Sequence, residues 1–414
     1  MLSLPIFHPE IHLKEFLKEQ VNVIALQIER ESQYIDDYGL LNGKAGVALL
    51  FGYLAKLSGD KYLFEFTYGL MSELMDVLAN GELSESMSSG VAGIAFAFQH
   101  LNNMGVLDER TGFDLSEIDE FISIAVDHDF KMGNWDPLHG MVGLGIYFLE
   151  RNKENGAKKY LEKIVDYLRL MRTSVGGQKV WVTPGDAKYV DDNYNFGMAH
   201  GMPGILSFLA QVYKRGIRQV EIEEMICSCL PFLLKSEFKR NRNSSFPALI
   251  KVAELSEKSP PSSRLAWCYG DLCVANMLIH CGSSLDRVEW EDRGIEIALK
   301  TVHRRFEDAG CVDAPFCNGS VGIVHQYRRL FSRTGNQIFC DAAENWIGHT
   351  LKTYYKPGAG VGGYFSRCFD EESNSFKYLP KYGLLEGSAG IALAWLSYLY
   401  DIKPDWDIVF LTNV

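Results

Sequence analysis

Two cysteines and two histidines of this chain stand just before glycines in similar short segments. Cys268 lies in R-L-A-W-C-Y-G and Cys317 in D-A-P-F-C-N-G, and each cysteine is two residues before its glycine. His139 ends N-W-D-P-L-H and His200 ends N-F-G-M-A-H, one residue before their glycines. Two thiolates that faced one point would begin a zinc site, and Asp136 could pair with an imidazole for acid–base chemistry.

Each of these residue types also has a purely structural interpretation. Free cysteine is among the most buried residue types, so Cys268 and Cys317 could simply fill the core. A lone histidine or aspartate at a helix start is more often a cap or a satisfied polar group than a catalytic residue. The functional interpretation therefore depends on whether the fold brings these side chains together.

A Gly-x-x-Gly step followed by apolar residues recurs along the chain and supplies the elements that position these side chains. The seven copies begin at Gly43, Gly90, Gly140, Gly201, Gly270, Gly319 and Gly387. The fifth copy has Cys273 in place of its second glycine. Neighbouring copies are 47 to 69 residues apart, and about 50 residues hold two helices and two connections. The spacing predicts a repeat of helical hairpins.

Closure of the hairpins into a ring is favoured because neither end of the chain shows a polar capping repeat. The sequence thus predicts an all-α fold, an α/α toroid of seven helical hairpins, over a single domain, residues 1–414. The three longest intervals contain insertions predicted as loops or hairpins, at 174–193, 239–263 and 355–380. The first glycine is expected to adopt an unusual backbone angle at the helix start, and the second to let neighbouring helices approach closely.

A toroid places the residue before each first glycine on one rim. These rim residues are Asn42, Ser89, His139, His200, Tyr269, Asn318 and Glu386. Helix N-termini converge on the same rim, and their partial positive charges suit an anion or a thiolate. A purely structural repeat has no reason to place different polar side chains at equivalent positions, so the rim is predicted to be the functional site.

Composition limits the classes of function. The 414 residues include 41 basic and 53 acidic side chains, and the net charge of −12 argues against a protein built to bind nucleic acid. No apolar run reaches the roughly 18 residues of a membrane span, and residues 1–30 lack a signal pattern and are predicted as an amphipathic helix. The nine cysteines are odd in number and fit reduced thiols or metal ligands, so a cytoplasmic location is expected.

The combined pattern resembles the lanthionine synthetase C-like family. The matching features are Asp136 four residues before a motif glycine, A-H-G at 199–201, R-x-x-W-C-Y-G at 264–270 and a cysteine before the sixth glycine. The likeness extends from about residue 40 to about residue 400. It implies an α/α toroid with one catalytic Zn²⁺ held by two cysteines and a histidine, which assigns the metal to Cys268 and Cys317. The implied partners are a dehydrated precursor peptide and a lanthipeptide dehydratase.

The sixth motif departs from the family pattern at the third ligand. The family has Cys-His-Gly there, whereas this chain has Asn318 after Cys317. A neutral amide oxygen suits harder ions than zinc. Asn318 itself or His139 could complete the site, with His325 and Cys273 less well placed. Otherwise zinc would bind weakly through two cysteines and water, or would be lost.

The resemblance also implies a reaction, in which a peptide cysteine thiol adds to dehydroalanine or dehydrobutyrine and forms a lanthionine or methyllanthionine ring. The thiol must become a thiolate, and the enolate left by the addition must be protonated by an acid. By motif position, His200 is the acid, and Asp136 is its partner or accepts the thiol proton. Tyr269 and Arg264 orient the peptide or stabilise the enolate oxygen. Without a metal, His200 or His139 would activate the thiol.

Two alternatives stay open. A catalytically weak or zinc-less relative could bind a modified precursor peptide or a dehydratase partner, and Asn318 favours this alternative. A glycosidase-type toroid could instead pair Asp136 with Asp271 or Glu386, but it explains neither the two cysteines nor the A-H-G segment.

Overall fold

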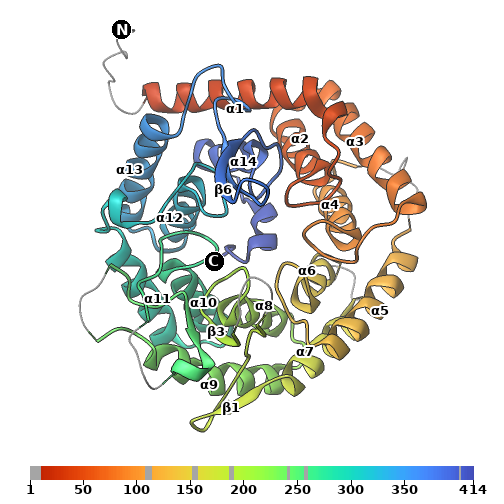
Figure 1. Ribbon diagram of the computed structural model, residues 1–414. Helices are drawn as coiled ribbons and strands as arrows, with labels where there is room; N and C mark the ends of the chain where they lie inside the picture. Colours follow the sequence, from red (N-terminus) through yellow and green to blue (C-terminus); the bar gives the residue numbers. More distant parts are fainter. Residues whose placement is uncertain are drawn as a thin grey trace.

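The computed structural model describes residues 11–107, 114–151, 157–185, 191–239, 243–255, 260–400 and 402–414. In these ranges seven inner helices form a ring, and seven outer helices surround it (Figure 1). The prediction of an all-α toroid is therefore confirmed, while the assignment of residues 1–414 to a single domain stays a prediction. Within the same ranges no helix is both long and apolar enough to cross a lipid bilayer.

Every inner helix begins one residue after the first glycine of a motif. The inner helices are α2 (Lys44–Ser58), α4 (Val91–Asn103), α6 (Met141–Arg151), α8 (Met202–Lys214), α10 (Asp271–Ser284), α12 (Ser320–Thr334) and α14 (Ser388–Leu399). They are buried on nearly all faces, and α10 buries every residue from its start to Gly282. Helices that are apolar all round belong in the interior of a large fold, which is why these segments form the inner layer.

The outer helices each bury one face only. They are α1 (Ile11–Glu31), α3 (Lys61–Asn80), α5 (Ser116–Met132), α7 (Lys158–Leu170), α9 (Gln219–Lys235), α11 (Val288–Thr301) and α13 (Gln337–Thr353). Helix α1 lies along α14, so the N-terminal helix supplies the outer partner of the last inner helix (Figure 1). The seventh hairpin is thus built from both ends of the described chain, which closes the ring.

Short strands occupy the three predicted insertions. The antiparallel pairs are β1 (Thr173–Val175) with β2 (Gln178–Val180), β3 (Asn193–Asn195) with β4 (Leu249–Lys251), and β5 (Ser366–Asp370) with β6 (Ser375–Leu379). Short 3₁₀ turns lie at η1 (Ser32–Tyr34), η4 (Val252–Glu254) and η5 (Phe306–Asp308). Parts of the first two insertions, residues 186–190, 240–242 and 256–259, lie outside the described residues.

The first glycines of the motifs are needed for space rather than for an unusual backbone angle, so that expectation was wrong. Gly43 and Gly90 have φ of −119° and −116°, which any residue can adopt. A Cβ atom at Gly43 would lie 2.2 Å from the Asp37 carbonyl oxygen, and one at Gly90 would lie 2.0 Å from that of Ser84. Gly270 is an exception, because its φ of 123° also favours glycine.

The second glycines of the first two motifs leave space for a loop of a neighbouring repeat to pack against the helix. A Cβ atom at Gly46 would lie 2.9 Å from Leu384 Cβ, and one at Gly93 would lie 2.8 Å from Leu40 Cβ. Both partners belong to loops that precede inner helices, not to the helices themselves. The predicted close approach therefore exists, but it joins a helix to a loop.

Backbone hydrogen bonds run from repeat to repeat through the residue two before the first glycine in six of the seven motifs. The amide of this residue donates to the carbonyl of its counterpart in Leu41→Ser88 (2.9 Å), Ser88→Leu138 (3.2 Å), Cys268→Cys317 (3.3 Å), Cys317→Leu385 (3.1 Å) and Leu385→Leu41 (2.7 Å). The last bond joins the seventh motif to the first. Together these bonds link the loops of the fifth, sixth, seventh, first, second and third motifs in that order.

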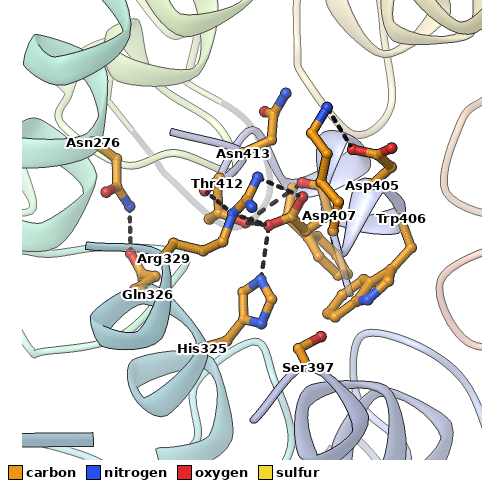
Figure 2. Close-up of polar contacts among 12 residues, drawn as sticks. Asn276, His325, Gln326, Arg329, Ser397, Asp405, Trp406, Asp407, Thr412 and Asn413 are labelled. Atoms are coloured by element: carbon orange, nitrogen blue, oxygen red, sulfur yellow. Dashed lines mark hydrogen bonds and ion pairs between the residues drawn. The ribbon is translucent and has the colours of Figure 1, made fainter. Parts of the chain in front are cut away.

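The C-terminal segment fills the interior of the ring. It includes η6 (Asp405–Phe410), and the C terminus lies near the centre of the toroid (Figure 1). Asp407 contacts His325 at 2.8 Å and Arg329 at 2.9 Å, and both of these residues belong to α12 (Figure 2). The Phe410 carbonyl accepts a hydrogen bond from Trp267 Nε1 at 2.8 Å. The segment therefore supports the loop residue that precedes Cys268.

Candidate functional site

The residues that precede the motif glycines line one cavity of about 410 Å³. Both residues before each first glycine contribute, in the pairs Leu41 and Asn42, Ser88 and Ser89, Leu138 and His139, Ala199 and His200, Cys268 and Tyr269, Cys317 and Asn318, and Leu385 and Glu386. Asp37 completes the lining. All seven rim residues thus face the same space, and inner helices begin immediately beyond them.

His200 and Asp136 form a close pair at this cavity. His200 Nδ1 is 2.7 Å from Asp136 Oδ2, and the two side chains are 24% and 20% exposed. Asp136 Oδ1 accepts hydrogen bonds from the amides of Leu138 and His139, at 2.8 and 2.9 Å. Burial raises the pKa of Asp136, but the hydrogen bond and charge of His200 outweigh it and leave that pKa below its usual value. The carboxylate is therefore ionised and can hold the imidazole in one orientation.

His139 lies beside this pair but is held by a different partner. Its Nδ1 atom is 2.8 Å from the hydroxyl oxygen of Ser88. The rings of His139 and His200 are stacked, with centroids 5.9 Å apart and planes inclined by 16°. The cavity therefore has two adjacent imidazoles, of which one is paired with a carboxylate and the other with a hydroxyl.

Cys268 and Cys317 lie next to each other on the same cavity wall. A hydrogen bond from the Cys317 thiol lowers the pKa of Cys268, against the opposing effect of burial, and the charge of Arg264 lowers it further. The same hydrogen bond, together with burial, raises the pKa of Cys317 well above its usual value. One thiol of the pair is thus the readier to become a thiolate, and two soft sulfur donors stand together.

Asn318 occupies the position at which the resemblance predicts the third zinc ligand, and it contacts both Cys268 and Arg264. The Cys268 thiol donates to Asn318 Oδ1 at 2.9 Å, and Arg264 Nη1 donates to the same oxygen at 2.8 Å. The two thiols fit zinc, since sulfur is a preferred ligand of this ion. The amide oxygen is a weaker donor, and it already accepts from a guanidinium.

The other candidates for a third ligand are not beside the thiols. Among the described residues, no group of three His, Cys, Asp or Glu ligand atoms that all lie within 4.8 Å of one another includes Cys268 and Cys317. His325 is fully buried against Asp407, and the Cys273 thiol donates to the Trp267 carbonyl at 3.0 Å. His139 lines the cavity but is bound to Ser88. The third ligand, Asn318 or His139, stays a prediction.

The remaining predicted residues divide between the cavity and its surroundings. Tyr269 lines the cavity, and its hydroxyl accepts a hydrogen bond from Asn195 Nδ2 at 3.3 Å. Arg264 is exposed and reaches the site through Asn318. Asp271, one carboxylate of the glycosidase alternative, is buried against Arg304 at 3.0 Å and does not line the cavity. This geometry removes the basis for a carboxylate pair that includes Asp271.

Sequence reasoning missed Ser88, which lines the cavity, and Asp313, which does not line it but whose charge acts on Cys317. Ser88 was overlooked although it is the counterpart of Cys268 and Cys317 in the second motif, and a comparison of all residues at that position would have found it. Asp313 is buried, and burial together with the charge of Glu386 raises its pKa to about 6. No repeat position marks Asp313, so nothing in the sequence pattern singles it out.

Comparison with known proteins places this geometry among related folds. Nisin cyclase has a similar structure, with a TM-score of 0.77 and 19% sequence identity over 96% of this chain and 98% of that chain. A sugar epimerase from a ruminal bacterium (8% identity, 94% of this chain and 100% of that chain) and cellobiose 2-epimerase from Bacillus thermoamylovorans B4167 (10% identity, same coverage) both have TM-scores of 0.47. Likeness at that level says nothing about the function of this chain. A search of curated proteins finds no match.

The family itself is settled by sequence. A model of the lanthionine synthetase C-like protein family matches residues 34–411, which include all seven motifs. The resemblance inferred from the motifs is therefore confirmed, and the chain belongs to the lanthionine synthetase C-like family.

Proposed function

We propose that the protein is a lanthipeptide cyclase, which adds a cysteine thiol of a dehydrated precursor peptide to a dehydroalanine or dehydrobutyrine of the same peptide. The observation that carries this proposal is the single cavity of about 410 Å³ that receives His200 and both Cys268 and Cys317. An acid–base group and two thiols around one space suit a reaction that removes a proton from sulfur and returns one to carbon.

The His200–Asp136 pair can perform both proton transfers. Asp136 occupies Nδ1 of the ring at 2.7 Å, which leaves Nε2 for exchange with a ligand. The substrate thiol gives its proton to a base, and its sulfur forms a bond to the β-carbon of the dehydro residue. The electron pair of the double bond moves to the α-carbon as an enolate, which takes a proton from His200. Atoms balance without loss, so the ring product has the mass of the linear peptide.

Tyr269 and Arg264 are proposed to bind the peptide near the reacting atoms. Tyr269 faces the cavity, and Arg264 holds Asn318 at its edge. A guanidinium at this edge stabilises negative charge that develops on the enolate oxygen. Both residues thus act by position and charge rather than by proton transfer.

Zn²⁺ would be held by Cys268 and Cys317, with the Asn318 amide oxygen beside them. When bound, zinc lowers the pKa of a coordinated thiol and so supplies a thiolate at neutral pH. The described cysteines are all free thiols. Free thiols fit a reducing compartment, which supports the proposed cytoplasmic location.

A second candidate function is a zinc-less relative that binds a modified peptide or a dehydratase partner. The observation that favours it is the contact of 2.8 Å between Arg264 Nη1 and Asn318 Oδ1. A fixed positive charge beside the third ligand position opposes a divalent cation by Coulomb repulsion. In this alternative the cavity would recognise the peptide without closing a ring.

Incubation with a dehydrated peptide separates the two functions. After incubation, free thiols are alkylated and the product is weighed. A cyclase gives a peptide that no longer takes the alkyl group and has unchanged mass. A peptide that binds the protein but is fully alkylated would reject cyclisation and support the second candidate.

Metal analysis of purified protein tests the role of Asn318. We expect Asn318→His to raise the zinc content of the protein, because imidazole completes the set of two thiols. Asn42→His is the matched control, since it adds a histidine to the same cavity at the first motif, which has no cysteine. Absence of zinc from both variants would reject a metal site at Cys268 and Cys317.

A further inference from the structure

We propose a second metal site, for a first-row divalent cation such as Mn²⁺ or Zn²⁺, formed by Glu85, His128 and Asp129. One ligand atom from each of these residues lies within 4.8 Å of the other two. His128 Nδ1 is 3.8 Å from Glu85 Oε1. Donors bound to one ion at roughly 2.1 Å are about 3 to 4 Å apart, so small side-chain movements would suffice to surround a cation.

Asp129 supplies an independent sign of a missing partner. The residue is only 3% exposed, and its Oδ1 atom accepts a hydrogen bond from Asn134 Nδ2 at 2.9 Å. Its Oδ2 atom is buried and has no hydrogen-bond partner among the described residues. A buried carboxylate oxygen without a partner is costly, and a coordinated cation would remove that cost.

The charges around Asp129 also favour a cation. Burial raises the pKa of Asp129 to about 6, and the negative charges of Glu85 and Asp136 act in the same direction. The third member, His128, is an imidazole that adds no negative charge, and its side chain is 62% exposed. A divalent ion would balance the two carboxylates that converge here.

The donor set indicates the kind of ion. Two carboxylates and one imidazole suit Mn²⁺ and Zn²⁺ better than Ca²⁺ or Mg²⁺, which prefer oxygen ligands alone. Glu85 and His128 are 34% and 62% exposed, so water can reach the ion and fill its remaining positions. No thiol belongs to the cluster, which distinguishes it chemically from Cys268 and Cys317.

The proposed ion would connect two segments whose loops contribute to the cavity, although none of its three ligands lines the cavity. Glu85 lies in the loop 81–90, between α3 and α4, which also contains Ser88. His128 and Asp129 lie near the C-terminal end of α5, which precedes the loop 133–140 that contains Asp136 and His139.

Asn134 makes the connection to that loop. Its Nδ2 atom donates to Asp129 Oδ1 at 2.9 Å and to the His139 carbonyl at 3.1 Å. Asp129 is therefore a positioning residue, and the ion would fix the spacing of the two loops.

Manganese titration of the full-length protein, stripped of metal, tests the proposal. Mn²⁺ is chosen because it binds carboxylate and imidazole in preference to thiolate. The loss of the free Mn²⁺ signal in electron paramagnetic resonance measures binding, and the same samples give a thermal melting temperature. We expect one Mn²⁺ per chain and a higher melting temperature when it is bound.

The variants Glu85→Gln and His128→Gln remove ligands at a partly exposed and an exposed position, so we expect both proteins to fold. Loss of a second-shell partner alone weakens metal binding by about 10- to 100-fold, so each variant should weaken it at least tenfold. Glu82→Gln, in the same loop, and His303→Gln are matched controls at exposed residues outside the cluster.

Absence of binding at millimolar manganese, or equal binding by the cluster variants and the controls, would overturn the proposal. The measurement does not involve cyclisation, so it stands or fails independently of the proposed function. A Cys268→Ser, Cys317→Ser double variant that keeps its manganese would place the ion outside the thiol pair, whereas a variant that loses it would reject the assignment.

Discussion

Two histidine–aspartate pairs lie inside the same ring of helices, and their hydrogen bonds are almost equal in length. His200 Nδ1 is 2.7 Å from Asp136 Oδ2, and His325 Nε2 is 2.8 Å from Asp407 Oδ2. The side chains of the first pair are 24% and 20% exposed, whereas those of the second are 1% and 0% exposed. His200 of the first pair lines the cavity, whereas the second pair attaches the C-terminal segment to α12 (Figure 2).

The residues around the His325–Asp407 pair also exclude water. The rings of Trp406 and Phe316 pack against His325, with centroids 4.8 and 5.4 Å away, and Arg329 also contacts Asp407. Burial lowers the pKa of His325, and Arg329 and His325 hold the pKa of Asp407 below its usual value despite its burial. A hydrogen-bond length thus does not identify a catalytic pair. Access to a ligand decides whether the imidazole can exchange a proton.

The largest expected effect is the loss of ring formation in His200→Asn. Removal of a general acid or base costs about 10²- to 10⁴-fold in rate, and the partly exposed site should tolerate the change without unfolding. Thiol alkylation and mass measurement of a dehydrated peptide give the rate. His325→Asn is the matched variant, since it removes the histidine of the sealed pair. It should lower stability while the folded fraction cyclises at the normal rate, and a normal rate for His200→Asn would break the comparison.

The next largest effect is a loss of folding stability when the buried His325–Asp407 pair is broken. Asp407→Ala leaves the Arg329 guanidinium buried without its carboxylate, and breaking a buried ion pair in this way costs about 3 to 5 kcal/mol in the free energy of unfolding. Asp405→Ala is the control, because Asp405 pairs with Lys403 at the surface, where an ion pair contributes about 0 to 1 kcal/mol. Urea unfolding measures both variants. Equal losses would show that the buried network does not hold the C-terminal segment.

The folding stability should also fall at acid pH because of the buried histidine His280. Burial lowers the pKa of His280, whose Nε2 contacts the Leu411 carbonyl at 3.1 Å, to about 4. The unfolded chain binds this proton at about pH 6.5, so stability is complete above that pH and is lost as the pH falls towards 4. The stability difference between the wild type and His280→Gln should therefore shrink by about 3 kcal/mol between about pH 7 and about pH 4.

Unfolding curves at both pH values give that difference. Asp129 and Asp313 act in the opposite direction, because their pKa values are raised to about 6, but both proteins share them. Their contribution therefore cancels. If the stability difference between the wild type and His280→Gln did not change with pH, His280 would be accessible to protons. The contrast between the exposed cavity and the buried interior would then fail.

The repeat made most of the fold predictable from sequence. The first glycines of the seven motifs set the start of every inner helix, and the rim residues follow from their register. Closure of the ring was predicted, but the helices that close it were not. Nothing in the segment 11–31 marks it as the outer partner of α14. The glycine angles were mistaken because sequence shows that a side chain is excluded but not whether torsion or space excludes it.

The residues of the candidate site that occupy positions of the repeated motif could be predicted from the sequence. His200 and Cys268 occupy motif positions, so their place at the cavity follows from the fold. Asn134, which ties Asp129 to the His139 loop, occupies no motif position. Its role depends on loop geometry that only the folded chain defines.

The smallest expected effect concerns Ser88, which distinguishes the two imidazoles of the cavity. Ser88→Ala removes the hydroxyl that lies 2.8 Å from His139 Nδ1. A hydrogen bond of this kind contributes about 0.5 to 1.5 kcal/mol, so the rate of ring formation should fall about 2- to 10-fold if His139 supports His200 through its fixed orientation. The maximal rate should fall while peptide affinity stays constant, because the stacked rings and not the peptide lose a contact. Ser84→Ala, an exposed position in the same loop, is the control. A change in affinity alone would assign Ser88 to peptide binding and separate His139 from the proton transfer.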